Sequence, residues 1–211
     1  YDNLQKLIES SIFKNIPISH TSMLTGEIVF AIIKRAIELS ILELGAPPAR
    51  FAWFSIGSQA RKEQLLPTDQ DSFLVFEDVV PNLYRDVRDY FLKLTKKTSS
   101  ILEKVGFLNC ENGHTASNML WCKSLTDWTK QFNNWTNTPG ENANEIFSIF
   151  LDYELVYGES QIEEVINNIV FKTRKNDALI FDFLGNDTLN KPKPLNFFKK
   201  IVLEEDGEHK G

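Results

Sequence analysis

The sequence predicts an α+β protein in which a small mixed sheet is flanked by helices and followed by part of a helical domain. Two observations lead to this class. Short apolar runs that suit buried strands alternate with longer segments whose apolar residues recur every three or four positions, as in helices. The second part of the chain is then mainly helical in its spacing. We expect one domain with N-terminal helices over residues 1–138 and a truncated helical domain over residues 139–211.

Composition is that of an ordinary globular protein, with 42% hydrophobic and 25% charged residues in a chain of 211. These values exclude a disordered chain or a collagen-like repeat. The net charge of −6 would repel a polyanion, so we expect no nucleic acid partner. No apolar run approaches the roughly 20 residues of a membrane span, so we expect no membrane partner either.

Cysteine usage and the first residues indicate a compartment. Cys110 and Cys122 form neither a zinc-binding CxxC pair nor a secreted disulfide framework, so a reduced, cytoplasmic environment is expected. The chain begins at Tyr1 without an initiator Met or a basic and apolar leader. This start suggests a fragment of a longer protein rather than a signal peptide.

The first half of the chain predicts a long helix and two strands. Apolar spacing indicates a helix over residues 23–44, which Gly45 and the following prolines end. The aromatic and β-branched run 51–56 predicts a strand. A second strand, 72–76, is apolar on both faces and is therefore expected to be central. Residues 58–66 between them are expected to turn into a short helix.

Further elements follow in alternation. We expect a helix over residues 81–105, a third strand over 107–110, and then a helix that Ser124 and Asp127 start as a capping box. An aromatic stripe follows on that helix, and we interpret it as core packing rather than a ligand site: Leu125, Trp128, Phe132 and Trp135.

The chain beyond residue 136 is expected to be helical. The turn-forming stretch 137–140 is the best candidate for a domain boundary. Helical spacing then covers the apolar positions between residues 146 and 156, and again those between 162 and 169.

The chemistry-bearing stretch is 57–71, which lies between the two strands of the first half. Residues alternate sides along a strand, so Asp69 and Asp71 should share one face while Gln70 points to the other. Paired carboxylates form a hard-oxygen site that suits Mg²⁺. Gly57-Ser58 permits close backbone approach and offers a hydroxyl and nearby amides to an anion. A metal site that faces a phosphate site indicates phosphoryl or nucleotidyl transfer.

Simpler interpretations exist for each part, because an isolated Gly-Ser is usually a turn and an isolated Asp-x-Asp is usually a solvated loop. The order of the parts is more specific. Haloacid-dehalogenase phosphatases and many glycosyltransferases place Asp-x-Asp after an apolar strand, whereas here it precedes strand 72–76. The further residues of an EF-hand are missing, as is a Walker A motif.

Strand, Gly-Ser, short helix, Asp-x-Asp and strand is the order of nucleotidyltransferases of the polymerase-beta-like superfamily. Residues 57–64 (GSQARKEQ) and 68–71 (TDQD) resemble one branch of it, nucleotidyltransferase-like proteins commonly fused to CBS domains and related to protein-PII uridylyltransferase. Residues 116–135, 148–152 and 156–158 are similar to the middle of that family and to the start of its helical second domain. The resemblance thus covers nearly the whole chain.

The resemblance implies that Asp69 and Asp71 hold Mg²⁺ and act in catalysis, and that Gly57-Ser58 binds a nucleoside triphosphate. It implies that Arg61 or Lys62 offsets the charge of the triphosphate. The metal would bridge phosphate oxygens, activate an acceptor hydroxyl for attack on the α-phosphate and stabilise the departing pyrophosphate.

The family pattern leaves three points open. Glu63 and Gln64 are more simply explained as braces of the loop than as catalytic groups. A third carboxylate often lies on a neighbouring strand, and Glu111 or Asp152 is a candidate for it. Relatives tend to carry a basic residue soon after that aspartate, where this chain has Glu154.

Two functions therefore compete. The favoured one is an enzyme that moves a nucleoside monophosphate from Mg²⁺-bound triphosphate to an unknown acceptor, either a protein or a small molecule. The alternative is a catalytically inactive, nucleotide-sensing regulatory module, which the CBS association of the relatives and the open third carboxylate suggest. A pure interaction scaffold would bind no nucleotide.

Overall fold

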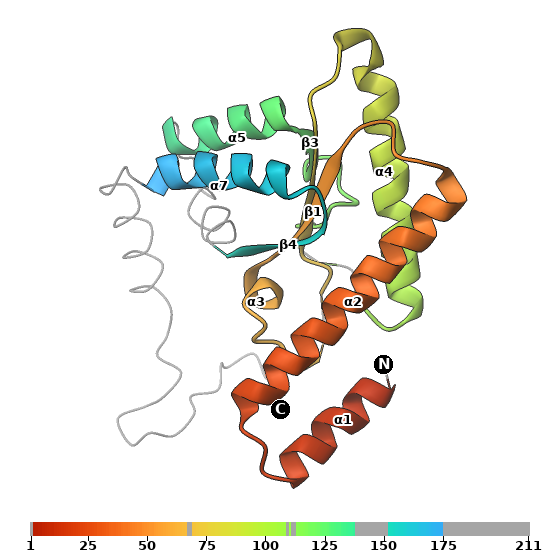
Figure 1. Ribbon diagram of the computed structural model, residues 1–211, viewed down its shortest axis with the longest axis vertical. Coiled ribbons are helices and arrows are strands. Elements are labelled where there is room, and N and C mark those ends of the chain that lie inside the picture. The colour runs from red at the N-terminus through yellow and green to blue at the C-terminus, as the bar shows by residue number, and fades with distance from the viewer. Residues whose placement is uncertain (1, 67–68, 109, 111–112, 138–151, 175–211) are drawn as a thin grey trace, which may run out of the picture. The chain divides into compact units, whose positions relative to one another are not determined.

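The computed structural model describes residues 2–66, 69–108, 110, 113–137 and 152–174. All of them lie within one compact unit, Tyr1–Lys175. A sheet in the middle of this unit has helices on both faces (Figure 1). The α+β class and the mixed sheet that the sequence predicts are confirmed.

Four described strands form the sheet in the order β3-β2-β1-β4. Strand β1 (Phe51–Ile56) pairs antiparallel with β2 (Ser72–Phe76) and with β4 (Tyr153–Gly158), whereas β2 pairs parallel with the short β3 (Cys122–Ser124). Every residue of β1 and β2 is buried. Both strands occur where the sequence predicts them, and both are central because each has a partner on either side.

Helices α2 (Ile18–Leu44) and α4 (Pro81–Lys104) cover one face of the sheet, and α1 (Asp2–Phe13) packs on α2 (Figure 1). Their apolar residues pack with alternate strand residues such as Trp53 and Leu74. Helix α2 begins five residues before the predicted start, at Ile18. Helices α2 and α4 lie side by side in Figure 1, where Thr98 Oγ1 of α4 donates to Ser40 Oγ of α2 at 3.1 Å.

Helices α5 (Leu125–Asn137) and α7 (Ser160–Arg174) cover the other face (Figure 1). The backbone N–H of Asp127 donates to Ser124 Oγ at 3.3 Å, as the predicted capping residue requires. Trp128 and Phe132 are fully buried against Phe54 and its neighbours. The interpretation of the aromatic stripe as core packing is confirmed.

The predicted strand at 107–110 is wrong, since residues 107, 108 and 110 form no strand. Gly106, at φ +102°, ends α4, and Phe107 N–H donates back to Leu102 O at 3.1 Å. This is the pattern of a glycine-based helix C-terminus, in which the following apolar residue packs onto the helix it ends. Phe107 is 3% exposed for that reason.

The spacing of apolar residues between 146 and 156 predicts a helix, and this prediction is wrong at its C-terminal end, where Tyr153–Gly158 is strand β4. Tyr153 and Leu155 pack with the α5–α7 face, and Val156 packs with the opposite face. Residues 146–150, the expected boundary near 138 and the candidate Glu111 lie outside the described residues, so the division into two domains stays a prediction. The helix expected around 162–169 is present as α7.

The helix expected over 58–66 is only one turn long, α3 (Gly57–Ala60). Lys62 has a φ of +54°, and a residue in this left-handed conformation cannot continue a right-handed helix. No helix in the described part of the chain is both long and apolar enough to cross a membrane.

Candidate functional site

The Gly57-Ser58 turn lies where β1 leaves the sheet. Gly57 has a φ of +65°, a conformation that glycine adopts without strain. Its N–H donates to Asp152 O at 2.9 Å, which joins it to the residue before β4. Arg61 N–H donates to Gly57 O, and Glu63 N–H donates to Ser58 O, both at 3.1 Å. The chain therefore folds tightly around Ser58.

Asp71 lies beside this turn because β2 runs antiparallel to β1. The backbone N–H of Ile56 donates to Asp71 O at 3.2 Å, so the start of β2 lies beside the end of β1. The Asp71 side chain is half-buried, and its Oδ1 is buried without a hydrogen-bond partner. A buried carboxylate oxygen of this kind is costly unless a cation or a donor meets it.

Gln70 shows the alternation that the sequence predicts around it. Gln70 is 5% exposed, and its Oε1 accepts from Ser99 Oγ of α4 at 2.5 Å. Since neighbouring residues of an extended segment point to opposite sides, the Asp71 carboxylate is directed away from α4. Asp69 is also half-buried. Both aspartates precede β2 rather than lying within it.

Glu63 and Gln64 hold the loop, as expected for braces. Gln64 Nε2 donates to Ser58 Oγ at 2.8 Å, and Glu63 Oε2 accepts from Arg61 Nε at 2.9 Å. Both side chains therefore make the contacts that bracing residues would make. They also fix the Ser58 hydroxyl, which keeps its own proton available for a further acceptor.

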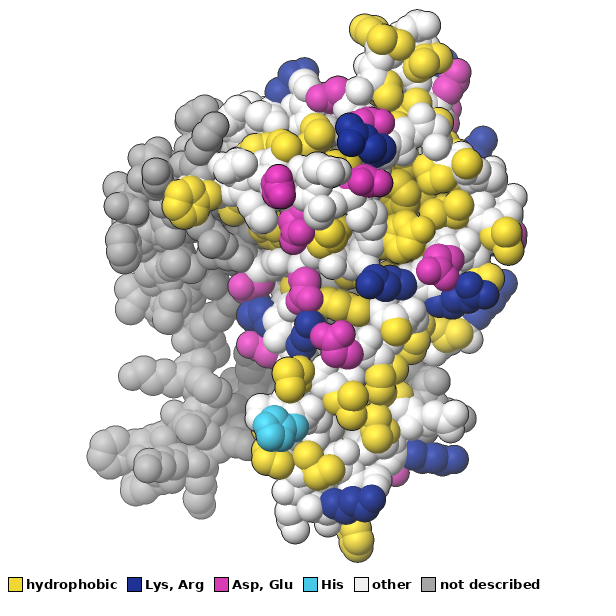
Figure 2. All heavy atoms as spheres, in the orientation of Figure 1, with side chains coloured by type: hydrophobic (Ala, Val, Ile, Leu, Met, Phe, Trp, Pro, Cys, Tyr) yellow, Lys and Arg dark blue, Asp and Glu magenta, His cyan; other side chains and the backbone are white. Residues whose placement is uncertain are grey.

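The two cations of the motif are both paired with carboxylates. Arg61 Nη1 lies 2.6 Å from Asp152 Oδ2, and both side chains are about two-fifths exposed. Lys62 Nζ lies 2.8 Å from Glu27 Oε1 of α2 and 3.0 Å from Glu154 Oε1 of β4. The hydrogen bonds that Lys62 donates to Glu27, and then to Glu154, raise its pKa above the ordinary value. In Figure 2 acidic and basic side chains alternate over the region where Figure 1 places α3.

The structure thus brings together most of the residues that the sequence singles out. Asp152 joins them through Gly57 and Arg61, although it is 81 positions beyond Asp71 in the chain. Glu27 and Phe30 of α2 were missed, because both belong to an ordinary helical pattern. Glu154, where the resemblance leads one to expect a basic residue, has a partner here in Lys62.

The chemistry of the donors fits a divalent cation at Asp71. Its unpartnered, buried Oδ1 is a hard, anionic ligand of the kind that Mg²⁺ prefers. Within the described ranges, no three His, Cys, Asp or Glu side chains are grouped so that they could hold a metal ion together. A cation at this place would therefore take further ligands from triphosphate oxygens or water, as Mg²⁺ usually does.

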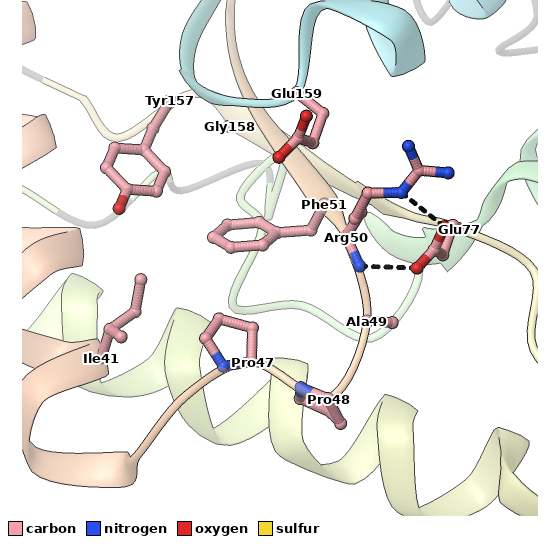
Figure 3. A pocket seen from close by; sticks show the side chains of 10 residues that line it. All are labelled: Ile41, Pro47, Pro48, Ala49, Arg50, Phe51, Glu77, Tyr157, Gly158 and Glu159. Atoms are coloured by element: carbon pink, nitrogen blue, oxygen red, sulfur yellow. Dashed lines mark hydrogen bonds and ion pairs between the residues drawn. The ribbon is translucent and has the colours of Figure 1, made fainter.

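A pocket of about 720 Å³ lies at the opposite end of β1, beside Phe51 (Figure 3). Tyr157 and Phe51 form part of its wall. Arg50 is held there by Glu77, whose carboxylate accepts from the Arg50 backbone N–H at 2.9 Å and from Nε at 2.8 Å. None of the candidate site residues lines this pocket, so it is separate from the Gly57-Ser58 turn.

Comparison with known families places this chain in one of them. The chain belongs to the family described as "Putative nucleotidyltransferase DUF294", whose model matches residues 2–142. The matched range includes the Gly57-Ser58 turn, Asp69 and Asp71, and it ends before Asp152. Membership supports nucleotidyl transfer as the class of function. No curated protein matches the chain.

Proposed function

We propose that this protein transfers a nucleoside monophosphate from a Mg²⁺-bound nucleoside triphosphate to an acceptor. The observation that carries the proposal is the buried, unpartnered Oδ1 of Asp71, which lies beside the Gly57-Ser58 turn. This carboxylate oxygen can bind a cation, and the Ser58 hydroxyl beside it can donate its proton to a phosphate oxygen. Together they suit a metal-bound triphosphate. Family membership supports the same class of reaction.

In this proposal Asp69 and Asp71 would hold Mg²⁺, which when bound would neutralise phosphate charge and orient the α-phosphate. The space beside the Gly57 backbone is open to a triphosphate, since a Cβ at this position would meet no atom within 4 Å, and the φ of +65° favours glycine there. The Ser58 hydroxyl, held by Gln64, donates its proton to a phosphate oxygen.

The reaction follows from these positions. The acceptor oxygen forms a bond to the α-phosphorus while the bond to the bridging oxygen of pyrophosphate breaks. The acceptor proton leaves to a carboxylate of the site, and the pyrophosphate carries away the electron pair of the broken bond. The site residues contribute by holding charge and geometry at the α-phosphate rather than by covalent chemistry.

Arg61 would exchange partners in this cycle. In the structure it pairs with Asp152 at 2.6 Å and with Glu63 at 2.9 Å. When a triphosphate binds, Arg61 would turn to the phosphates and leave Asp152 as the candidate third carboxylate. The exchange is feasible because both side chains are partly exposed, where an ion pair contributes only about 0–1 kcal/mol.

The alternative function is a nucleotide-sensing module that binds without transfer. The Arg61–Asp152 pair favours it, since a carboxylate that stays with Arg61 is not available to a metal. We propose a protein or small-molecule acceptor for the enzyme rather than a nucleic acid, because the net charge is −6. A cytoplasmic setting is proposed from the cysteine usage, and a CBS-linked signalling role from the resemblance alone.

Pyrophosphate release distinguishes the two functions. The wild-type protein is incubated with each nucleoside triphosphate, Mg²⁺ and candidate acceptors, and the Asp71→Asn variant is the matched control. Acceptor-dependent release by the wild type alone supports the enzyme. Nucleotide binding without release for any acceptor supports the sensor, and release that is equal in both proteins contradicts the role of Asp71.

A further inference from the structure

Lys62 has an unusual backbone conformation for a lysine. Its φ of +54° lies in the left-handed region, which residues other than glycine rarely adopt. Among the non-glycine residues that the structure describes, only Asn15 also has a positive φ. A strained residue of this kind persists only when its surroundings hold it in place. The contacts of the side chain are therefore expected to account for the conformation.

The ammonium group of Lys62 is held from three directions. Glu27 of α2 lies at 2.8 Å and Glu154 of β4 at 3.0 Å, while the ring centroid of Phe30 lies 5.2 Å from Nζ. The Lys62 side chain is only 22% exposed. Its charge is thus already balanced by two carboxylates and an aromatic face, which leaves little of it for a phosphate.

The aliphatic part of Lys62 lies directly on the backbone of α2. A Cβ added at Gly26 would be 2.7 Å from Lys62 Cγ and 2.8 Å from Lys62 Cβ, closer than real Cβ atoms approach. Gly26 is in the interior of a helix, where alanine is intrinsically more favourable than glycine. The contact with Lys62 gives a physical reason for glycine at this position.

We infer that Lys62 is a positioning residue that fixes the segment 58–66 to α2 and β4, and that it does not bind the triphosphate. The inference rests on the proposed function, and it assigns Lys62 a role different from the one that the family resemblance implies. Through Lys62, the placement of α2 determines how the Ser58 turn and Asp71 face each other.

The test removes the two carboxylates that pair with Lys62, Glu27 and Glu154. A positioning role and a phosphate-binding role of Lys62 predict opposite changes in triphosphate affinity. A double variant, Glu27→Gln with Glu154→Gln, removes both ion pairs of Lys62 and keeps side-chain size. If Lys62 only positions the loop, Mg²⁺-triphosphate affinity falls roughly three- to tenfold, as expected for partly exposed pairs. If Lys62 binds phosphate, freeing it makes binding tighter. Because the loss of two carboxylates also lessens repulsion of the triphosphate, Lys62→Met is added to the double variant, and tighter binding that this third change abolishes would overturn the inference.

Three further variants support the reading of that result. Glu38→Gln removes an exposed carboxylate of the same helix, which pairs with Arg35, and should leave affinity unchanged. Lys62→Met should weaken binding as the double variant does, and Lys62→Arg should restore most of it. Gly26→Ala should weaken binding without raising the melting temperature. A higher melting temperature with unchanged affinity would show that no contact opposes the added methyl group.

Hydrogen exchange separates this inference from the proposed function. Amide exchange of residues 62–66 should become faster in Lys62→Met and in the double variant, but not in Glu38→Gln, whether or not nucleotide is present. If the wild type binds no nucleotide and exchange still responds, the proposed function fails while the anchoring role stands. Unchanged exchange in all variants overturns the anchoring role itself.

Discussion

Replacing Asp71 by asparagine tests the candidate metal site through its charge. The substitution keeps the size of the side chain, and it leaves the backbone hydrogen bond from Ile56 N–H to Asp71 O in place. It removes one negative charge and places an uncharged amide where Oδ1 is buried without a partner. If the carboxylate instead makes a structural hydrogen bond, the substitution would weaken that bond and lower stability.

The expected effect on stability has a definite sign. Two carboxylates two residues apart, about 6 Å along an extended segment, repel by about 3 kcal/mol at an effective dielectric constant of 20. An unpartnered buried oxygen costs about 1–3 kcal/mol. Asp71→Asn relieves the charge repulsion but leaves a polar atom without a partner at the buried position, so the metal-free variant should be as stable as the wild type or more stable by up to about 3 kcal/mol. That upper value corresponds to a melting temperature about 6–12 °C higher.

The assay is thermal melting with Mg²⁺ and triphosphate, or with triphosphate and EDTA. A ligand at 100 times its Kd stabilises the folded state by about 2.7 kcal/mol, a shift of about 5–10 °C for a protein of this size. The wild type should show this shift with Mg²⁺, and Asp71→Asn should lose it. Asp86→Asn, on the exposed face of α4, is the matched control and should behave as the wild type does. A sharply lower melting temperature of Asp71→Asn with the ligand shift intact would make Asp71 a structural residue.

Three further predictions address the turn, the sheet and the packing of α4. Ser58→Ala should weaken triphosphate binding, measured by calorimetry, about 10- to 150-fold, because a charge-assisted hydrogen bond to phosphate is lost. If Gln64→Leu weakens binding equally, the effect belongs to bracing of the loop rather than to the Ser58 hydroxyl. Gly158→Ala should lower the free energy of unfolding by several kcal/mol more than Gly45→Ala in urea titrations. Both glycines have a positive φ, but of the two only Gly158 would place an added Cβ against backbone, 2.1 Å from the carbonyl oxygen of Phe51 in the paired strand. Equal losses of unfolding free energy in the two variants would contradict this close approach. Burial and a hydrogen bond to an α5 carboxylate raise the pKa of Tyr84 from 10 to about 12, so the stability that the neutral phenol provides is present below pH 10 and is lost as the pH rises through 12. Unfolding measured from pH 9 to 12 should show this loss in the wild type and a flatter profile in Tyr84→Phe, and identical profiles would contradict it.

The sequence predicted the parts of the fold that local pattern determines. The strands at 51–56 and 72–76 are apolar throughout and central, and α2, α4, α5 and α7 follow the spacing of their apolar residues. Strand β4 was missed because Tyr153 and Val156 also suit a helix and the pairing with β1 is not written locally. Strand β3 was missed because it is three residues long and depends on β2 for its pairing.

The candidate site divides in the same way. Gly57, Ser58, Asp69 and Asp71 are close together in sequence, so their motif could be read directly. Their surroundings come from distant segments: Asp152 reaches Gly57 only because β4 pairs with β1. The contacts of Lys62 with Gly26 and Glu27 depend on the placement of α2, and no residue spacing indicates them.

The central claim, that Asp71 and the Ser58 turn form a site for a metal-bound triphosphate, is tested most directly by isothermal calorimetry. Each of the four common ribonucleoside triphosphates is titrated into the wild-type protein, once with Mg²⁺ and once with EDTA. The account predicts that at least one of them binds more tightly with Mg²⁺, because the carboxylates of Asp69 and Asp71 otherwise repel the triphosphate. Equal or tighter binding in EDTA, or no binding of any triphosphate, would contradict it.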